Sequence, residues 1–174
     1  TNTMPYPPIK LLEELKQALP NLQINEYPET TYKELREALA NYLWRNIDEI
    51  TVTAGCDEAL DIIAKVFVDS ETNVLVSTPT YAMYRVTVEA MGGKIVQILR
   101  KPDFSDNTEK LIEAVNENTR LIFLCSPNNP TGNLTSKETV VKLLEETDCA
   151  VVVDESYAEF CSQTFINLID KYEN

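Results

Sequence analysis

The sequence contains no histidine, and this absence limits the chemistry that the chain can perform. Ser-His and Cys-His nucleophilic catalysis both need an imidazole base, so both are excluded. The cysteines form no CxxC pair, so neither a zinc site nor a disulfide framework is indicated and no metal is expected; they are Cys56, Cys125, Cys149 and Cys161. Acid-base chemistry must therefore come from Lys, Tyr, Asp, Glu or a cofactor.

Long apolar runs and an excess of positive charge are also missing. No apolar run approaches the roughly 20 residues that span a bilayer, and the opening TNTMPYPPIK lacks the apolar segment of a signal peptide. Acidic residues outnumber basic ones by 28 to 15, which disfavours nonspecific binding to nucleic acid or to an anionic membrane. We therefore expect a cytoplasmic protein with no nucleic-acid or membrane partner.

The sequence does contain a regular alternation of apolar runs and amphipathic segments. Helical patterns cover about 57–68, 81–91, 108–117 and 136–146, and strand-like runs lie between them at 50–54, 73–77, 94–99, 120–125 and 149–153. Strands that are apolar on both faces and alternate with helices are typical of a parallel sheet covered on both sides. The pattern predicts an α/β fold with three α-β-α layers and a mainly parallel central sheet.

The residues before this alternation form an N-terminal arm, predicted to cover 1–31. A Pro-rich entry leads into a helix that stops at Pro20, and its apolar positions are Leu11, Leu12, Leu15 and Leu19. A second helix is predicted from Tyr32 to about Arg45, with Thr30 or Thr31 as its cap. The range 32–174 is interpreted as part of a larger domain, ending in one more short helix within TFINLIDKYEN.

Two of the predicted strands end in motifs that are ambiguous by themselves. In an open parallel sheet, ligands collect at the carboxyl ends of the strands. AGCDEAL places Gly55 in a tight turn before a helix whose free N–H groups could hold a phosphate, although a simple βα turn is the better explanation of this motif taken alone. PTYAMY places Tyr81 and Tyr84 where an aromatic ring could stack on a flat ligand, although aromatic residues one turn apart are more often core.

Two other strand ends are more informative. In LCSPNNPTG, two prolines, two asparagines and a glycine fix a rigid loop whose amide side chain can point at a ligand oxygen. In VVVDESYAEF, a buried strand ends in Asp154, and a carboxylate there is costly unless a cation or donor meets it. A protonated pyridine nitrogen is such a partner, and the phenol of Tyr157 could reach another substituent of the same ring.

The four motifs, in this order, resemble the pyridoxal-phosphate-dependent aminotransferases of fold type I, and most closely the histidinol-phosphate aminotransferases. The arm segments NTMPYPP and EYPET resemble the corresponding family segments. The resemblance implies pyridoxal 5'-phosphate as cofactor, with each site residue in a role. Asp154 would pair with the pyridine nitrogen, Tyr157 and Asn129 would bond the 3-oxygen, Tyr81 would stack on the ring, and the phosphate cup would be formed by Gly55, Cys56 and Asp57.

The resemblance also implies partners and a reaction. Tyr27 would reach the cofactor phosphate of a neighbouring subunit in a homodimer, and Tyr6 would lie near the substrate entrance. The reaction would be ping-pong transamination between an amino donor and a 2-oxo acid, with histidinol phosphate and 2-oxoglutarate as the substrates, in histidine biosynthesis. A decarboxylase of a phosphorylated amino acid and a non-catalytic phosphate-binding or association module remain alternatives. A nicotinamide-binding Rossmann domain is disfavoured because TAGCDEAL lacks the GxGxxG spacing.

Two positions depart from the family pattern. Met4 stands where the arm commonly has asparagine. The family's Schiff-base lysine follows a further strand beyond the Asp-Tyr element, whereas the one lysine after Asp154 is Lys171, in a helical segment that is typical of a solvated surface. We therefore expect an N-terminal fragment that lacks the catalytic lysine and the C-terminal small domain, and that is inactive by itself.

Overall fold

A computed structural model describes residues 5–174 of the chain, so Met4 lies outside the described range. The chain divides into two compact units, unit 1 up to Ile50 and unit 2 from Thr51 to Asn174. The boundary predicted after residue 31 separates the arm from the rest by sequence pattern, and it stays a prediction.

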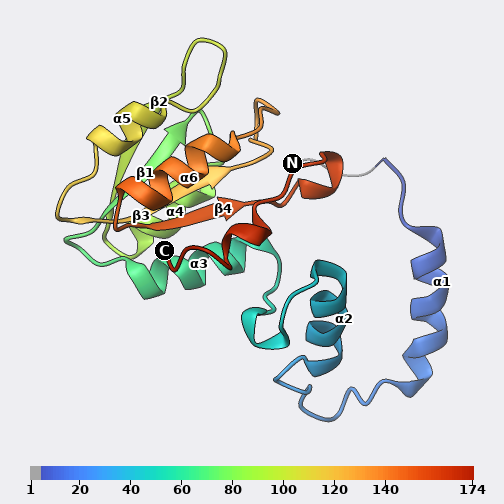
Figure 1. Cartoon of the computed structure of the whole chain (residues 1–174). Helices are drawn as coiled ribbons and strands as arrows, with labels where there is room; N and C mark the ends of the chain where they lie inside the picture. The colour runs from blue at the N-terminus through green and yellow to red at the C-terminus, as the bar shows by residue number, and fades with distance from the viewer. Residues whose placement is uncertain (1–4) are drawn as a thin grey trace. The chain divides into compact units, whose positions relative to one another are not determined.

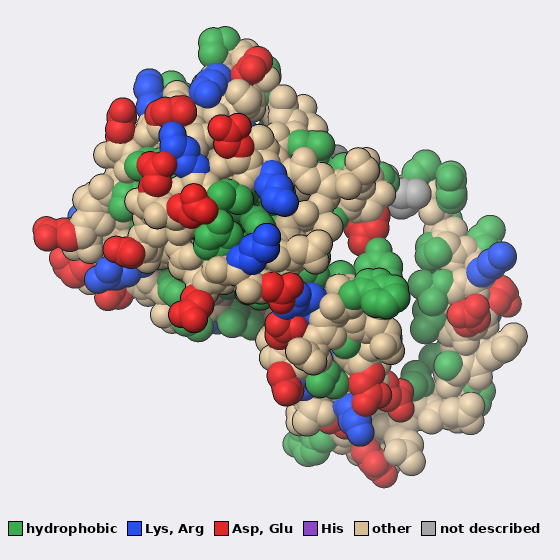
Figure 2. Space-filling view, in the orientation of Figure 1, with side chains coloured by type: hydrophobic (Ala, Val, Ile, Leu, Met, Phe, Trp, Pro, Cys, Tyr) green, Lys and Arg blue, Asp and Glu red, His purple; other side chains and the backbone are tan. Residues whose placement is uncertain are grey.

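Unit 1 consists of two short helices, each followed by a 3₁₀ turn. They are α1 (Ile9–Ala18), η1 (Leu19–Asn21), α2 (Lys33–Leu43) and η2 (Ile47–Glu49) (Figure 1). The first helix gives way to η1, which contains Pro20, as the sequence predicts. No residue from 5 to 50 is buried, and apolar side chains lie along the surface of α1 (Figure 2).

The start of α2 differs from the prediction, since neither Thr30 nor Thr31 caps it. Tyr32 occupies the N-cap position in a left-handed conformation (φ 50°) without a side-chain cap. The Glu29 carboxylate instead accepts hydrogen bonds from the N–H groups of Thr31 (2.7 Å) and Lys33 (3.2 Å). The glutamate side chain therefore satisfies the N–H of Lys33, which a threonine cap would have bonded.

Unit 2 is built on a parallel sheet of four strands in the order β2-β1-β3-β4. The strands are β1 (Asn73–Thr78), β2 (Lys94–Leu99), β3 (Thr119–Cys125) and β4 (Ala150–Asp154). The register places Cys125 opposite Asp154, so these two strands end side by side. The carboxyl ends of all four strands lie at one edge of the sheet, where a ligand site is expected.

Helices cover both faces of this sheet (Figure 1). α3 (Cys56–Phe67) and α4 (Met83–Ala90) pack on one face, and α5 (Thr108–Glu113) and α6 (Lys137–Glu146) pack on the other. Each face has its own core, one built around Tyr84 and Phe123 and the other around Ile122 and Leu143. The three-layer α-β-α arrangement predicted from the sequence is therefore confirmed.

The strand predicted at 50–54 is wrong. The run 50–54 pairs with no strand among the described residues; it ends instead in a tight turn in which Gly55 N–H donates to Thr53 O (2.8 Å). A β-strand exists only where a neighbour accepts its backbone hydrogen bonds, and no neighbour lies beside this run. The short helix predicted within TFINLIDKYEN is present as the 3₁₀ helix η4 (Ile166–Leu168). Asn174, which follows it, accepts a hydrogen bond from Val151 N–H (2.8 Å). None of the helices between residues 5 and 174 is long and apolar enough to cross a membrane.

Candidate active site

Asp154 is the last residue of β4, and its carboxylate is buried (9% exposed) at the carboxyl edge of the sheet. Its Oδ1 atom accepts hydrogen bonds from the N–H (3.0 Å) and hydroxyl (2.6 Å) of Ser156. Its Oδ2 atom accepts one from the Tyr84 hydroxyl (2.7 Å) and a weak one from the Cys56 thiol (3.5 Å). Neutral donors thus surround the carboxylate, and no lysine or arginine of residues 5–174 forms an ion pair with it.

The other buried carboxylate of unit 2 has a different environment. Asp106 forms an ion pair with Arg100 (Oδ1 to Nη1, 2.9 Å), and both side chains are 1% exposed. Its Oδ2 atom accepts a hydrogen bond from the Thr135 hydroxyl (2.7 Å). A buried carboxylate normally needs such a cation, so Asp154 is the one that fits an added positive charge at the sheet edge.

Tyr84 is a core residue whose hydroxyl bonds the Asp154 carboxylate. Its ring stacks on Phe123 with 4.9 Å between centroids and an interplanar angle of 10°, and its side chain is 1% exposed. Burial, together with the charge of Asp154, raises the pKa of the Tyr84 phenol far above its usual range, so this hydroxyl is a hydrogen-bond donor at all ordinary pH values. Tyr81 meets Tyr84 edge-on, with 5.9 Å between ring centroids. The sequence alone does not show which of these two tyrosines bonds the buried Asp154 carboxylate.

Gly55 forms the turn into α3 with φ at +80°, a conformation that side-chain-bearing residues rarely adopt. Nothing lies within 4 Å of the position that a Cβ atom would occupy, so the glycine meets a backbone requirement and the space beside it is open. The N–H groups at the start of α3, which include those of Cys56 and Asp57, have no partner within the helix. The predicted phosphate cup therefore has the backbone geometry that anion binding needs.

The Cys56 thiol connects this turn with Asp154. The 3.5 Å contact joins the first residue of α3 to the last residue of β4. Partial burial, with further effects from Asp154, raises the pKa of the thiol to about 11. The thiol is therefore protonated at neutral pH and acts as a weak donor.

Asp57 lies next to Cys56, and its side chain points to Tyr81. The Tyr81 hydroxyl donates a hydrogen bond to Asp57 Oδ1 (2.9 Å). This hydrogen bond, followed by desolvation, raises the pKa of Tyr81 to about 12. The remaining acidic side chain of the turn, Glu58, accepts a hydrogen bond from Ala54 N–H.

The rigid loop after β3 is held by Asn128, which sequence reasoning did not select. Its amide donates to Pro79 O (3.1 Å) and to the Thr131 hydroxyl (2.8 Å), and it accepts from the Thr80 hydroxyl (2.8 Å). Because Asn128 is buried with its amide fully bonded, the next residue, Asn129, is the one left with an amide side chain available for a ligand. The hydrogen bonds of Asn128 also link this loop to the segment that leads to Tyr81.

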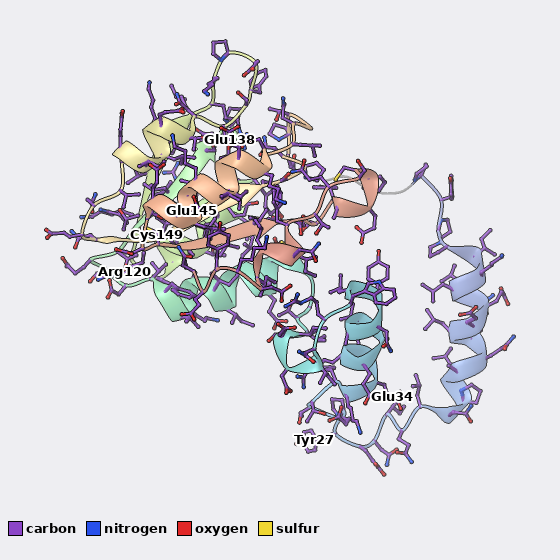
Figure 3. The ribbon with its side chains drawn as sticks, in the orientation of Figure 1. Tyr27, Glu34, Arg120, Glu138, Glu145 and Cys149 are labelled. Carbon is purple, nitrogen blue, oxygen red and sulfur yellow. The ribbon has the colours of Figure 1, made fainter. Side chains whose placement is uncertain are left out.

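The three predicted site residues that remain are Tyr157, Tyr6 and Tyr27. Tyr157 is half-buried at the start of η3 (Ala158–Phe160), where its ring centroid lies 6.5 Å from that of Phe160. Tyr6 (68% exposed) and Tyr27 (100% exposed) belong to unit 1. Tyr27 is labelled in Figure 3.

The lysines of the chain are mostly exposed. Nine of the ten are exposed and Lys142 is half-buried; the exposed ones are Lys10, Lys16, Lys33, Lys65, Lys94, Lys101, Lys110, Lys137 and Lys171. Those that form ion pairs in the described range contact only acidic groups outside the cluster, such as Glu109. No lysine of unit 2 forms an ion pair with Asp154.

Comparison with known proteins points in one direction. The family described as "Aminotransferase class I and II" matches residues 1–174. The histidinol-phosphate aminotransferase of Methanosarcina mazei is 39% identical over 169 residues, which cover 97% of this chain and 45% of that protein. The enzyme of the same name from Methanosarcina barkeri is 41% identical over 151 residues, 86% of this chain and 41% of that protein.

Solved structures agree with the sequence comparison. A crystal structure of histidinol-phosphate aminotransferase from Sinorhizobium meliloti, in complex with pyridoxal-5'-phosphate, superposes with a TM-score of 0.79 at 28% identity, covering 88% of this chain and 42% of that one. The chain thus spans less than half of the length of each of these three proteins.

Proposed function

Because the chain belongs to the class I and II aminotransferase family, we propose that it forms the cofactor-binding part of a pyridoxal-phosphate-dependent aminotransferase. The substrates proposed for the whole protein are histidinol phosphate and 2-oxoglutarate, since the relatives that match most of this chain carry the name histidinol-phosphate aminotransferase. Pyridoxal phosphate, when bound, supplies an electron sink for the transamination. The residues of this chain bind and orient it.

One observation carries the proposal. Asp154 is a buried carboxylate with no cation partner in residues 5–174. It also contacts the thiol of Cys56, which is the first residue of α3. A protonated ring nitrogen supplies the missing positive charge, and the first turn of α3 supplies N–H groups for a phosphate. The donor set therefore fits a ligand that carries both groups.

The site residues then take separate roles. Asp154 keeps the proton on the ring nitrogen, and Tyr84 and Ser156 fix the orientation of its carboxylate. The Cys56 thiol is the weakest of the four donors to this carboxylate, so Asp154 would keep acceptor capacity for a ring N–H. Tyr81 offers its ring face, and Asn129 and Tyr157 bond the 3-oxygen.

The remaining parts of the proposal concern residues beyond this cluster. Tyr27 reaches the phosphate of a neighbouring subunit in a homodimer, and Tyr6 lies near the substrate entrance. The exposed apolar residues of unit 1 support an assembly of this kind, because an amphipathic helix gains stability by packing its apolar face. The lysine that attaches the cofactor covalently is proposed to lie outside these 174 residues, so this chain alone is expected to be catalytically silent.

The test uses two aspartates at opposite ends of β4. In the whole protein, Asp154→Asn should lower the transamination of histidinol phosphate by roughly a hundred- to a thousand-fold, the scale seen when one preorganised electrostatic contact is lost from an active site. Asp148→Asn, which changes an exposed residue just before the strand, should leave the rate unchanged. Glutamate formation from 2-oxoglutarate measures both rates.

Near-normal turnover of Asp154→Asn would contradict the role of Asp154. A second measurement addresses the covalent lysine. The 174-residue chain is incubated with pyridoxal phosphate, reduced with borohydride and mapped by mass spectrometry. Scattered substoichiometric labelling of surface lysines is expected, whereas one stoichiometric adduct with half-transamination of an amino donor would show that the chain carries its own catalytic lysine.

A further inference from the structure

The first turn of α3 presents an electrostatic conflict. Asp57 and Glu58 both lie in this turn, and their N–H groups belong to the region proposed to bind a phosphate. Carboxylates are themselves attracted to a helix N-terminus, so each side chain can compete with a phosphate for the same N–H groups. Each also repels a dianion by its charge.

The structure shows where both carboxylates go. Glu58 is held by Ala54 N–H, on the backbone that enters the turn. Asp57 is held by the Tyr81 hydroxyl at 2.9 Å, and Tyr81 comes from a different segment, 24 residues further along the chain. Neither carboxylate accepts a hydrogen bond from an N–H group of its own first turn.

We propose that the Tyr81 hydroxyl is a positioning group that holds the Asp57 carboxylate away from the N–H groups of α3, so that a phosphate dianion can bind there. This inference rests on the proposed function, and it gives Tyr81 a second role besides presenting its ring face. The two roles use different parts of the side chain. The ring can stack without the hydroxyl, whereas only the hydroxyl can hold Asp57.

The two roles of Tyr81 can be told apart by comparing a ligand that has a ring and a phosphate with one that has the ring alone. If the hydroxyl protects the phosphate site, Tyr81→Phe weakens binding of a ligand only when that ligand carries a phosphate. If Tyr81 acts through its ring alone, Tyr81→Phe leaves both kinds of ligand unaffected. If Tyr81→Phe displaces the ring, both kinds are weakened equally.

The probes are pyridoxine 5'-phosphate and pyridoxine, which have no aldehyde and so cannot react with lysines. Calorimetric titration of the 174-residue chain should show Tyr81→Phe binding pyridoxine 5'-phosphate about five-fold more weakly than the unchanged chain, the scale of one charge at a helix N-terminus. Binding of pyridoxine should not change. Asp57→Asn should bind the phosphate probe more tightly, and Tyr81→Phe should then have no further effect in the Asp57→Asn background.

Glu58→Gln is the matched control, because it removes an acidic charge from the same turn that Tyr81 does not hold. Its effect should add to that of Tyr81→Phe. Equal losses for both probes, no loss for either, or a full Tyr81→Phe effect in the Asp57→Asn background would each overturn the inference while leaving the cofactor site in place. Failure of the unchanged chain to bind pyridoxine 5'-phosphate would overturn the proposed cofactor site and this inference together.

A ligand-free measurement tests the hydrogen bond itself. The pKa of Tyr81, raised to about 12 by Asp57, should fall towards the usual range of tyrosine in Asp57→Asn. The ultraviolet absorbance of phenolate reports this titration, and subtraction of the Tyr81→Phe curve isolates one tyrosine among eight. An unchanged Tyr81 titration in Asp57→Asn would show that the two residues are not bonded in solution, and the inference would be wrong.

Discussion

Units 1 and 2 contain helices of similar length and amphipathic pattern, yet they differ in what those helices cover. In unit 2, α3 and α6 bury Leu60 and Leu143 against the sheet, to 2% and 0% exposure. In unit 1, α1 and α2 bury no residue, and Leu15 remains 53% exposed. Periodicity in the sequence therefore predicts which residues form a helix, but burial depends on whether a second apolar surface is present.

The difference predicts where the free energy of unfolding resides. Phe123, in β3, is 1% exposed and stacks on Tyr84. Phe123→Ala should lower the free energy of unfolding of unit 2 by about 3–5 kcal/mol, since it leaves a cavity in a packed core. Leu15→Ala, in unit 1, should change the free energy of unfolding by less than about 0.5 kcal/mol. Chemical denaturation followed by circular dichroism measures both, and comparable losses would mean that unit 1 has a packed core of its own.

Ion pairs should show the same contrast with a smaller effect. Asp106→Asn leaves the Arg100 guanidinium buried without its counter-charge, which should cost about 3 kcal/mol. Asp48 in unit 1 is 96% exposed and lies 3.8 Å from Arg36, so Asp48→Asn should cost close to nothing. Denaturation midpoints of the two variants provide the comparison. If Asp106→Asn is neutral, the interior around Arg100 must admit water.

The smallest expected change concerns the single tryptophan. Trp44 follows α2 and is 92% exposed, so its fluorescence reports on unit 1 alone. We expect emission typical of water, ready quenching by acrylamide in the native chain, and almost no shift across the unfolding transition of unit 2. Blue-shifted and protected emission would instead indicate that a second copy of the chain covers this residue.

Local pattern was sufficient for most of unit 2. The predicted strands at 73–77, 94–99, 120–125 and 149–153 lie within one residue of β1 to β4. These runs are continuous and apolar, and each finds a neighbour in the sheet. The run 50–54 has a similar composition but no neighbour, and sequence alone cannot show this because strand pairing joins distant segments.

The candidate site divides in the same way. Motifs in the sequence predict Asp154, Gly55 and Asn129 as site residues, because Asp154 ends an apolar run, Gly55 precedes a helical pattern and Asn129 lies in a Pro- and Asn-rich loop. The residues that support them were missed, since their contacts cross long stretches of chain: 70 residues from Tyr84 to Asp154 and 48 from Thr80 to Asn128. Tyr84 gave a usable signal, an aromatic residue one turn after Tyr81, but that pattern equally fits a purely structural core residue.

The turn at Gly55 has a practical consequence for chemical synthesis. Its positive φ, with open space around it, is strained for an L-residue, but its mirror image is ordinary extended backbone. A D-alanine at position 55 would therefore fit the turn and would restrict the unfolded chain. The next residue is Cys56, which makes the 55–56 bond suitable for native chemical ligation. Joining 1–55 to 56–174 would introduce the D-residue, and it would also allow isotope labelling of one unit at a time, since the bond lies close to the boundary between them.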